Sequence, residues 1–324
     1  MARRGRLLQA DVHRSGMGQH PTVSDDGGLQ RLTEVTVALM HQPSNYEIVI
    51  RPTRGWFNLN LADLWQYRDL LVLLVHRDFV ARYKQTVLGP AWYVLQPLLT
   101  TVVFSIIFGA VAKIPTDGLP PMLFYLAGLL GWNYFAQTFQ SSSGTLVTNA
   151  GLFGKVYFPR LIVPLSAVIS NLFTFAIQLA TLLTLWIYFK LFTDAGPLFG
   201  FSVGIVWLPF VLLQVAALSL GGGLWLSALT AKYRDLVFLS GFIIQIWMYA
   251  TPVIYPLSQI PEKWRWLAVL NPMTMPVEAI KVMFLGRGTI VIAYLAMSVA
   301  TTIALLLSGV LIFNKVEKTF VDTV

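Results

Sequence analysis

The sequence predicts an all-α integral membrane protein with six transmembrane helices. It further predicts an N-terminal amphipathic interface helix, and external re-entrant or interfacial helices before the last span. Two observations lead to this prediction. Hydrophobic residues make up 56% of the 324 residues and charged residues only 12%, with a mean hydropathy of +0.66. Six long apolar runs follow a polar N-terminal segment, and charge is confined to the segments between the runs. This pattern is typical of a multi-pass membrane protein.

Residues 1–55 mix Gly, Ser, Asp, Arg, His and Pro with little periodicity. They predict a mobile cytoplasmic N-terminal extension. The net charge is +8, and 11 of the 23 Lys and Arg residues lie before residue 90. This distribution favours an anionic membrane surface as the partner of these cations, and we expect no nucleic acid to bind. The chain has no cysteine, which excludes disulfides, thiolate nucleophiles and Cys-ligated metals.

The region 56–89 predicts an amphipathic interface helix. Its purely apolar core, Leu70–Val75, is six residues long. That is too short to cross a bilayer, which needs about 20 residues. We expect the helix to lie in the cytoplasmic interface, the alternative being a soluble helix packed on another part of the protein. Its cations Arg77, Arg82 and Lys84 can reach a lipid phosphate or act as positive-inside anchors.

A transmembrane domain is predicted over residues 90–313, followed by a cytoplasmic C-terminal tail over 314–324. It starts at Gly89-Pro90, because proline suits the first turn of a helix. The predicted spans are 91–112, 122–140, 161–189, 203–230, 236–254 and 289–313. Six spans put both termini on one side. That side holds 17 Lys and Arg against 6 on the other, or 9 against 6 when only Arg77, Arg82 and Lys84 count from the N-terminal segment. The positive-inside rule therefore predicts that both termini are cytoplasmic.

The external segment 255–288 contains four prolines, which break it too often for a straight span. Its Trp264 and Trp266 are nevertheless membrane-seeking residues. We therefore expect one or two short re-entrant or interfacial helices here, with the non-helical backbone buried against protein.

The predicted spans contain no Asp, Glu, Lys, Arg or His, whereas ion-coupled transporters need a group there that changes charge. All four histidines precede the first span, and the sequence has no nucleophile–base–acid set. The nearest candidate for a phosphate-binding loop, Gly154-Lys155, is followed by Val156 where Ser or Thr is needed. The chain is therefore predicted to be no enzyme and to bind no cofactor, and any ATP that drives it must be bound by another polypeptide.

The loop over residues 149–160 has too many apolar residues for a solvated loop. A short helix ending at Pro159 would present Phe153 and Tyr157 at i,i+4, as a hydrophobic knob for a partner's groove. The alternative is a loop folded back onto the bilayer surface.

Five motifs carry a resemblance that runs from about Trp56 to Val324. They are RDFVARYKQTVLGPAWYVLQPLL, KVYFPRLIVPLSAVISNL, AKYRDLVFL, TPVIYPLSQIP and LNPMTMPVEAIK. Together and in this order, they resemble the permease subunit of polysaccharide ABC exporters, which handle O-antigen, capsule and teichoic-acid glycans through a type-2 exporter fold. One departure is Gly131, which stands where a proline is expected before Trp132.

The resemblance implies a homodimer in the bacterial inner membrane, with two copies of a nucleotide-binding ATPase subunit that hold ATP and Mg²⁺. The substrate would be a lipid-linked polysaccharide, and membrane lipids would be further partners. The interface helix would be a gate helix beside the substrate entrance. The ATPase-coupling loop would comprise Gly151, Leu152, Phe153, Lys155, Val156, Tyr157, Phe158 and Arg160. A second cytoplasmic contact would comprise Lys232, Tyr233, Arg234 and Asp235.

The first and fifth spans would line the glycan path. Aromatic rings there can stack on sugar faces, although interfacial or packing roles are the alternative. These aromatics are Trp92, Tyr93, Phe104, Phe108, Trp247 and Tyr249. Two other functions stay open from the residues: a type-2 permease that exports a drug or another lipid, and an ATP-independent membrane transporter or enzyme. The charge-free spans argue against the second.

Overall fold

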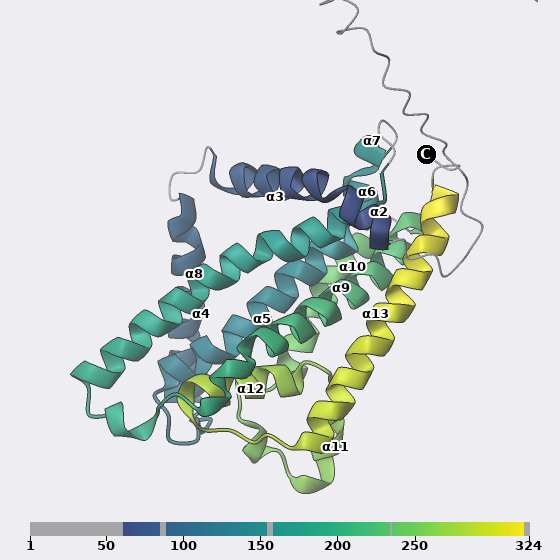
Figure 1. Ribbon diagram of the computed structural model, residues 1–324. Helices are drawn as coiled ribbons and strands as arrows, with labels where there is room; N and C mark the ends of the chain where they lie inside the picture. The colour runs from purple at the N-terminus through teal and green to yellow at the C-terminus, as the bar shows by residue number, and fades with distance from the viewer. Residues whose placement is uncertain (1–60, 85–88, 154–157, 234, 321–324) are drawn as a thin grey trace, which may run out of the picture. The chain divides into compact units, whose positions relative to one another are not determined.

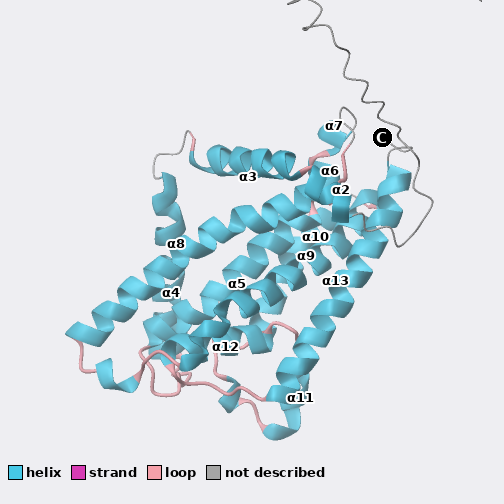
Figure 2. Cartoon of the chain, viewed as in Figure 1, coloured by secondary structure: helices cyan, strands magenta, loops and turns pink. Residues whose placement is uncertain are grey.

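The structure, a computed structural model, describes residues 61–84, 89–153, 158–233 and 235–320. The chain divides into two compact units, Met1–Thr53 and Arg54–Val324. The first unit, and with it most of the predicted N-terminal extension, lies outside the described residues. In the second unit, the described residues form helices, turns and loops (Figures 1 and 2).

The predicted interface helix is divided in two. Helix α2 covers Leu61–Gln66 and α3 covers Arg68–Tyr83, with a break at Tyr67. The chain leaves α3 through Lys84, whose backbone is extended. In Figure 1, α3 runs crosswise to α4, over the end of the helix bundle. We call this end of the bundle the α3 end and the opposite one the α11 end.

Four helical stretches are long and apolar enough to cross a membrane: Gly89–Val111, Ile162–Phe192, Val203–Lys232 and Ile292–Glu317. They match the first, third, fourth and sixth predicted spans. The helices that form them are α4 (Trp92–Phe104) with the π-helix η2 (Ser105–Val111), α8 (Ile162–Phe192), α9 (Leu208–Lys232) and α13 (Ile292–Phe320). The protein is thus an all-helical, multi-pass membrane protein, as predicted.

The second and fifth predicted spans form helices that are too short, or not apolar enough on average, to be counted with these four. Helix α10 (Leu236–Ala250) has only 15 residues. Helix α5 (Pro121–Ser143) has 23 residues, but its C-terminal half carries Asn133, Gln137 and Gln140. Most of α5 is buried in protein, so it does not need the apolar surface of a lipid-facing helix. The count of six spans stays a prediction.

Helix α5 is the centre of the core, and it packs against α4, α8, α9, α10 and α12. Two of its polar residues form hydrogen bonds across helix interfaces. Asn133 donates to Gln178 of α8 at 3.3 Å, and Gln140 accepts from Ser240 of α10 at 2.9 Å. Such bonds satisfy polar side chains away from water and join neighbouring helices. Gly131 does not interrupt α5, and a Cβ there would lie 2.6 Å from Ile280 Cδ1 of α12, so a larger residue would have to displace the end of the Ile280 side chain.

The segment before the last span forms two helices, α11 (Glu262–Leu270) and α12 (Thr274–Leu285). They are bent by 103° relative to each other, as in a broken span or a re-entrant loop. Trp264 and Trp266 of α11 are exposed, whereas α12 is almost wholly buried. The prediction of one or two short re-entrant or interfacial helices before the last span is thus confirmed, with two present. The remaining short elements are η1 (Gly89–Ala91), α6 (Thr145–Thr148), α7 (Ala150–Phe153), η3 (Gly196–Leu198), η4 (Val203–Trp207) and η5 (Leu257–Gln259).

Helices α9 and α13 are in close backbone contact. A Cβ on Gly221 of α9 would lie 2.6 Å from the Cα of Leu306 on α13. On other faces of α9, a Cβ on Gly222 would lie 2.9 Å from Phe139 Cε2, and one on Gly223 would lie 2.5 Å from Ser142 Cβ, both on α5. Small residues that let backbones approach closely are typical of helix packing in membranes.

We expect Gly221→Ala to separate α9 from α13, because the added methyl group would meet backbone that cannot rotate away. The loss should be about 1–3 kcal/mol, the usual cost of overpacking, and should appear as a lower unfolding temperature in detergent. Gly241→Ala is the matched control, since a Cβ on Gly241 of α10 meets nothing within 4 Å. Equal unfolding temperatures for the two variants would contradict this account of the contact.

Candidate functional site

At the α3 end, one hydrophobic cluster joins the interface helix to the loop before α8. We call it the α3-end cluster. Its buried members are Leu74, Phe158, Ile162 and Val163, and its partly buried members are Leu64, Tyr67, Leu70, Leu71, Leu152 and Phe153. The cluster therefore draws together two segments that the sequence singled out separately, the interface helix and the apolar loop.

Of the predicted helix that ends at Pro159, the structure describes only the two ends, because residues 154–157 lie outside the described residues. Helix α7 ends at Phe153, and Phe158 and Pro159 are not helical. Lys155, Val156 and Tyr157 lie outside the described residues, whereas Gly151 is exposed. Phe153 and Phe158 face each other with ring centroids 5.7 Å apart. Part of the apolar surface of this loop is thus covered within the chain.

Arg160 links this loop to the last turns of α13. Its side chain is buried, and its Nε lies 3.8 Å from Glu317 Oε1. Its Nη1 also donates to the backbone carbonyl of Glu317, and the guanidinium lies 5.3 Å from the centroid of the Phe153 ring. Carbonyls in the last turn of a helix lack an intrahelical partner, and a cation there opposes the helix dipole favourably. Arg160 therefore fixes the loop against the end of α13.

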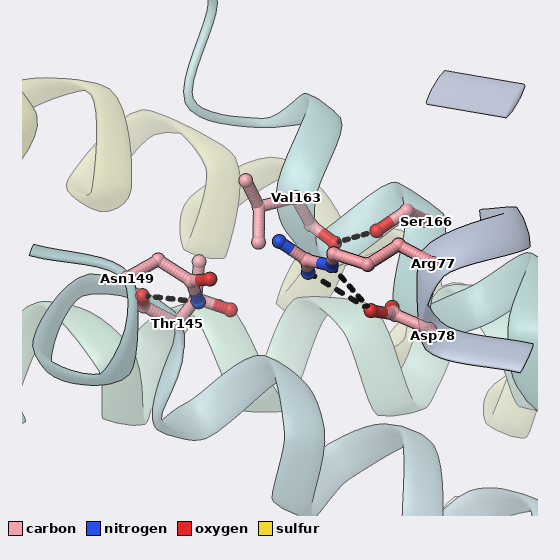
Figure 3. Close-up of polar contacts among 6 residues, drawn as sticks. All are labelled: Arg77, Asp78, Thr145, Asn149, Val163 and Ser166. Atoms are coloured by element: carbon pink, nitrogen blue, oxygen red, sulfur yellow. Dashed lines mark hydrogen bonds and ion pairs between the residues drawn. The ribbon is translucent and has the colours of Figure 1, made fainter. Parts of the chain in front are cut away.

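The three interface-helix cations differ in their surroundings. Arg77 forms an ion pair with Asp78 at 2.8 Å, and Figure 3 shows its side chain between α3 and the first turn of α8, near Val163. Lys84 is exposed, and the side chain of Arg82 is outside the described residues. Asp78 offsets the charge of Arg77, whereas Lys84 can face a lipid headgroup.

Figure 3 also shows two local side-chain hydrogen bonds at the α3 end. Asn149 Nδ2 donates to the carbonyl of Thr145 at 3.1 Å at the end of α6, and Ser166 Oγ donates to the carbonyl of Val163 at 2.7 Å in α8. Asn and Ser side chains often return to the backbone in this way near helix ends.

The second predicted contact follows α9. Tyr233 is half exposed, with Lys232 Nζ 5.2 Å from its ring centroid, and Asp235 directly precedes α10. Arg234 is outside the described residues.

The predicted path aromatics fall into two groups. Trp92 and Tyr249 are exposed by 50% and 53%. The other four are partly buried. Phe104 and Phe108 pack on the core around Tyr125, and Trp247 packs on Phe135 and donates to Asn271 at 2.7 Å. Tyr93, the fourth, is also partly buried.

Sequence reasoning missed one pair of charged residues. Lys281 was counted among the external loop charges, yet Lys281 and Glu278 of α12 are each only 1% exposed, and Lys281 Nζ lies 3.4 Å from Glu278 Oε1. The available signal was the i,i+3 spacing of opposite charges within an apolar stretch. Among the described residues, no group of three or more His, Asp or Glu side chains could hold a metal ion.

The fold and these sites define a helical membrane protein with a broken amphipathic helix at one end and a bent pair of helices at the other. Residues 69–285 match the family described as ABC-2 type transporter. The chain belongs to this family. It is therefore a membrane transport subunit and not an enzyme, as the sequence predicted.

Several relatives are similar over most of their length. The chain is 29% identical to an O-antigen export system permease protein of Klebsiella pneumoniae over 256 residues, which cover 78% of this chain and 94% of the relative. It is 28% identical to an O-antigen export system permease protein of Myxococcus xanthus, covering 82% of this chain and 98% of the relative. It is also 22% identical to a polysialic acid transport protein of Escherichia coli, covering 70% and 86%.

We expect Leu74→Ala to weaken the contact of α3 with the loop and with α8, because Leu74 is buried in the α3-end cluster. The expected loss is about 2–3 kcal/mol for a buried leucine, and faster hydrogen exchange along α3 should report it. Leu73→Ala is the matched control, since Leu73 is 63% exposed. Unchanged exchange in Leu74→Ala would mean that α3 is not held by this cluster.

Proposed function

We propose that this chain is the channel-forming subunit of an ATP-driven exporter that moves a lipid-linked polysaccharide from the cytoplasm across the bacterial inner membrane. The observation that carries the proposal is its similarity, over about four fifths of the chain, to permeases whose names state O-antigen export. A separate transport protein named for polysialic acid supports a polysaccharide as the substrate class.

In this proposal the α3 end faces the cytoplasm, and both termini are cytoplasmic. The bias of Lys and Arg supports this orientation. The burial of Lys281 strengthens it, because a lysine enclosed in protein should not be counted among the external charges. Lys155, Arg160, Lys232 and Arg234 then all lie on the positive side.

The functional unit would be a homodimer with two ATPase subunits, which bind ATP and Mg²⁺. Exposed apolar surface supports the dimer. Only 11% of the most apolar part of Gly89–Val111 is buried, the lowest share among the four candidate spans. Helix α10 also has an apolar groove, lined by Leu239, Phe242, Ile243, Ile246, Trp247 and Ala250. A second copy could cover these faces and enclose the path between them.

The coupling loop would receive the ATPase movement, and two contacts would carry it into the membrane. Phe153 and Phe158 join the loop to α3 through the α3-end cluster. Arg160 joins it to Glu317 and so to α13. A movement of the loop would then displace both the interface helix and the last span. Lys232, Tyr233, Arg234 and Asp235 would form a second contact with the ATPase.

The glycan would pass along α4 and α10. Sugar polymers need a path lined by protein, and uncharged aromatic walls let them slide without tight binding. Trp92 and Tyr249 are the better candidates for sugar contact, because their rings are exposed in the single chain. Trp247 would support the wall of the path without contacting the sugar, since its indole N–H donates a hydrogen bond to Asn271.

We expect Phe153→Ala with Tyr157→Ala to lose the partner ATPase, because the knob for its groove is removed. Co-purification of the ATPase from membranes measures this, while the amount of inserted permease should stay unchanged. Leu191→Ala with Phe192→Ala is the control, since these exposed apolar residues end α8 at the other end of the helix. An ATPase that co-purifies equally with both variants would refute the coupling assignment.

We also expect Arg82→Gln with Lys84→Gln to reduce export more than membrane insertion, because these cations would attract the lipid diphosphate of the substrate. Surface polysaccharide, compared with the amount of permease in the membrane, measures the effect. Arg68→Gln is the control, an exposed cation at the start of α3 that pairs with Asp69. If export and insertion fall together, the two cations are only topology anchors.

A further inference from the structure

Helix α12 contains an ion pair enclosed in protein. Glu278 and Lys281 lie one turn apart, each is 1% exposed, and Lys281 Nζ is 3.4 Å from Glu278 Oε1. Neither residue belongs to the proposed coupling loop or glycan path. A charged pair inside a membrane protein is costly to bury and calls for a functional explanation.

Lys281 connects α12 to two other parts of the protein. Its Nζ donates to the carbonyl of Pro252, directly after the end of α10. The same Nζ lies 4.0 Å from the ring centroid of Phe124 on α5, which is cation–π geometry. Gly128 of α5 makes room for this contact, since a Cβ there would lie 3.0 Å from the Val253 carbonyl oxygen and 3.3 Å from Lys281 Cε.

Glu278 connects α12 to the segment that leads into α13. Its Oε2 accepts from the backbone N–H of Thr289 at 3.5 Å, three residues before the start of α13. Gly288 has a φ of 144°, and a Cβ there would lie 3.0 Å from Glu278 Oε2 and 2.7 Å from Val282 Cγ2. Only glycine allows the chain to pass this close to the carboxylate.

We propose that Glu278 and Lys281 are positioning residues that join α12, the outer end of α10 and the start of α13 into one unit that moves together during export. Burial makes the pair a poor source of stability, because apolar residues of similar volume often serve as well. What the pair specifically provides is hydrogen bonds to two separate backbone segments, at Pro252 and at Thr289. The inference rests on the proposed export function, since α10 would line the glycan path and α13 would receive the movement of the coupling loop.

The first test compares Lys281→Met with the double variant Glu278→Gln/Lys281→Met in the full permease–ATPase complex. Lys281→Met leaves an unpaired buried carboxylate and should lower the unfolding temperature in detergent. The double variant should recover that temperature, yet export of the cell's own surface polysaccharide per ATP hydrolysed should stay roughly tenfold below the unmodified protein. Glu262→Gln is the control, an exposed i,i+3 pair with Arg265 on α11. A double variant that recovers both stability and export would overturn the proposal.

The second test keeps both charges, so it does not depend on the double variant folding. Gly128→Ala should push the Pro252–Val253 segment away from Lys281 and reduce export per ATP hydrolysed. Gly200→Ala, whose added methyl group meets nothing within 4 Å in the segment between α8 and α9, should not. Equal export by these two variants would overturn the proposal. If the unmodified complex exports no polysaccharide, the proposed function fails; if it exports and the variants match it, only the positioning role fails.

Discussion

Helix α5 is enclosed by protein on most of its faces. The need to cover these faces determines where the neighbouring helices lie. Helices α4, α8, α9, α10 and α12 all pack against α5. Because α5 contacts mainly protein, it can carry Asn133, Gln140 and Thr138, each hydrogen-bonded to a neighbouring helix. The partners of Asn133 and Thr138 are Gln178 and Asn171, which are buried residues of α8. The outer helices in turn keep apolar residues on their exposed faces, as Phe173, Ile187 and Leu191 of α8 show.

The same constraint explains where sequence reasoning succeeded. Lipid-facing helices such as α8 and α13 must be long and apolar, so their hydropathy predicts them and their bounds fall within a few residues. Prolines predicted the interruption between 255 and 288, and two helices with a bend of 103° lie there. The family resemblance, based on ordered motifs, is confirmed by a match over residues 69–285.

The failures have physical reasons too. The break between α2 and α3 at Tyr67 could not be predicted, because no proline or glycine lies next to it. Lys281 was read as an external charge because it follows a proline-rich segment, and only tertiary packing against Phe124 and Pro252 encloses it. Likewise, no local pattern connects Arg160 with Glu317, which are 157 residues apart in the chain.

These two ion pairs act at opposite ends of one helix. Arg160 binds the last turns of α13 at Glu317, and Glu278 binds the chain at Thr289, just before α13 begins. Between them, α13 is in backbone contact with α9 at Gly221, so it cannot bend away easily. A rigid helix held by polar contacts at both ends transmits displacement along its axis instead of absorbing it. In the proposed exporter, α13 would therefore link the coupling loop to the pair α11–α12, which contacts it at the α11 end of the bundle.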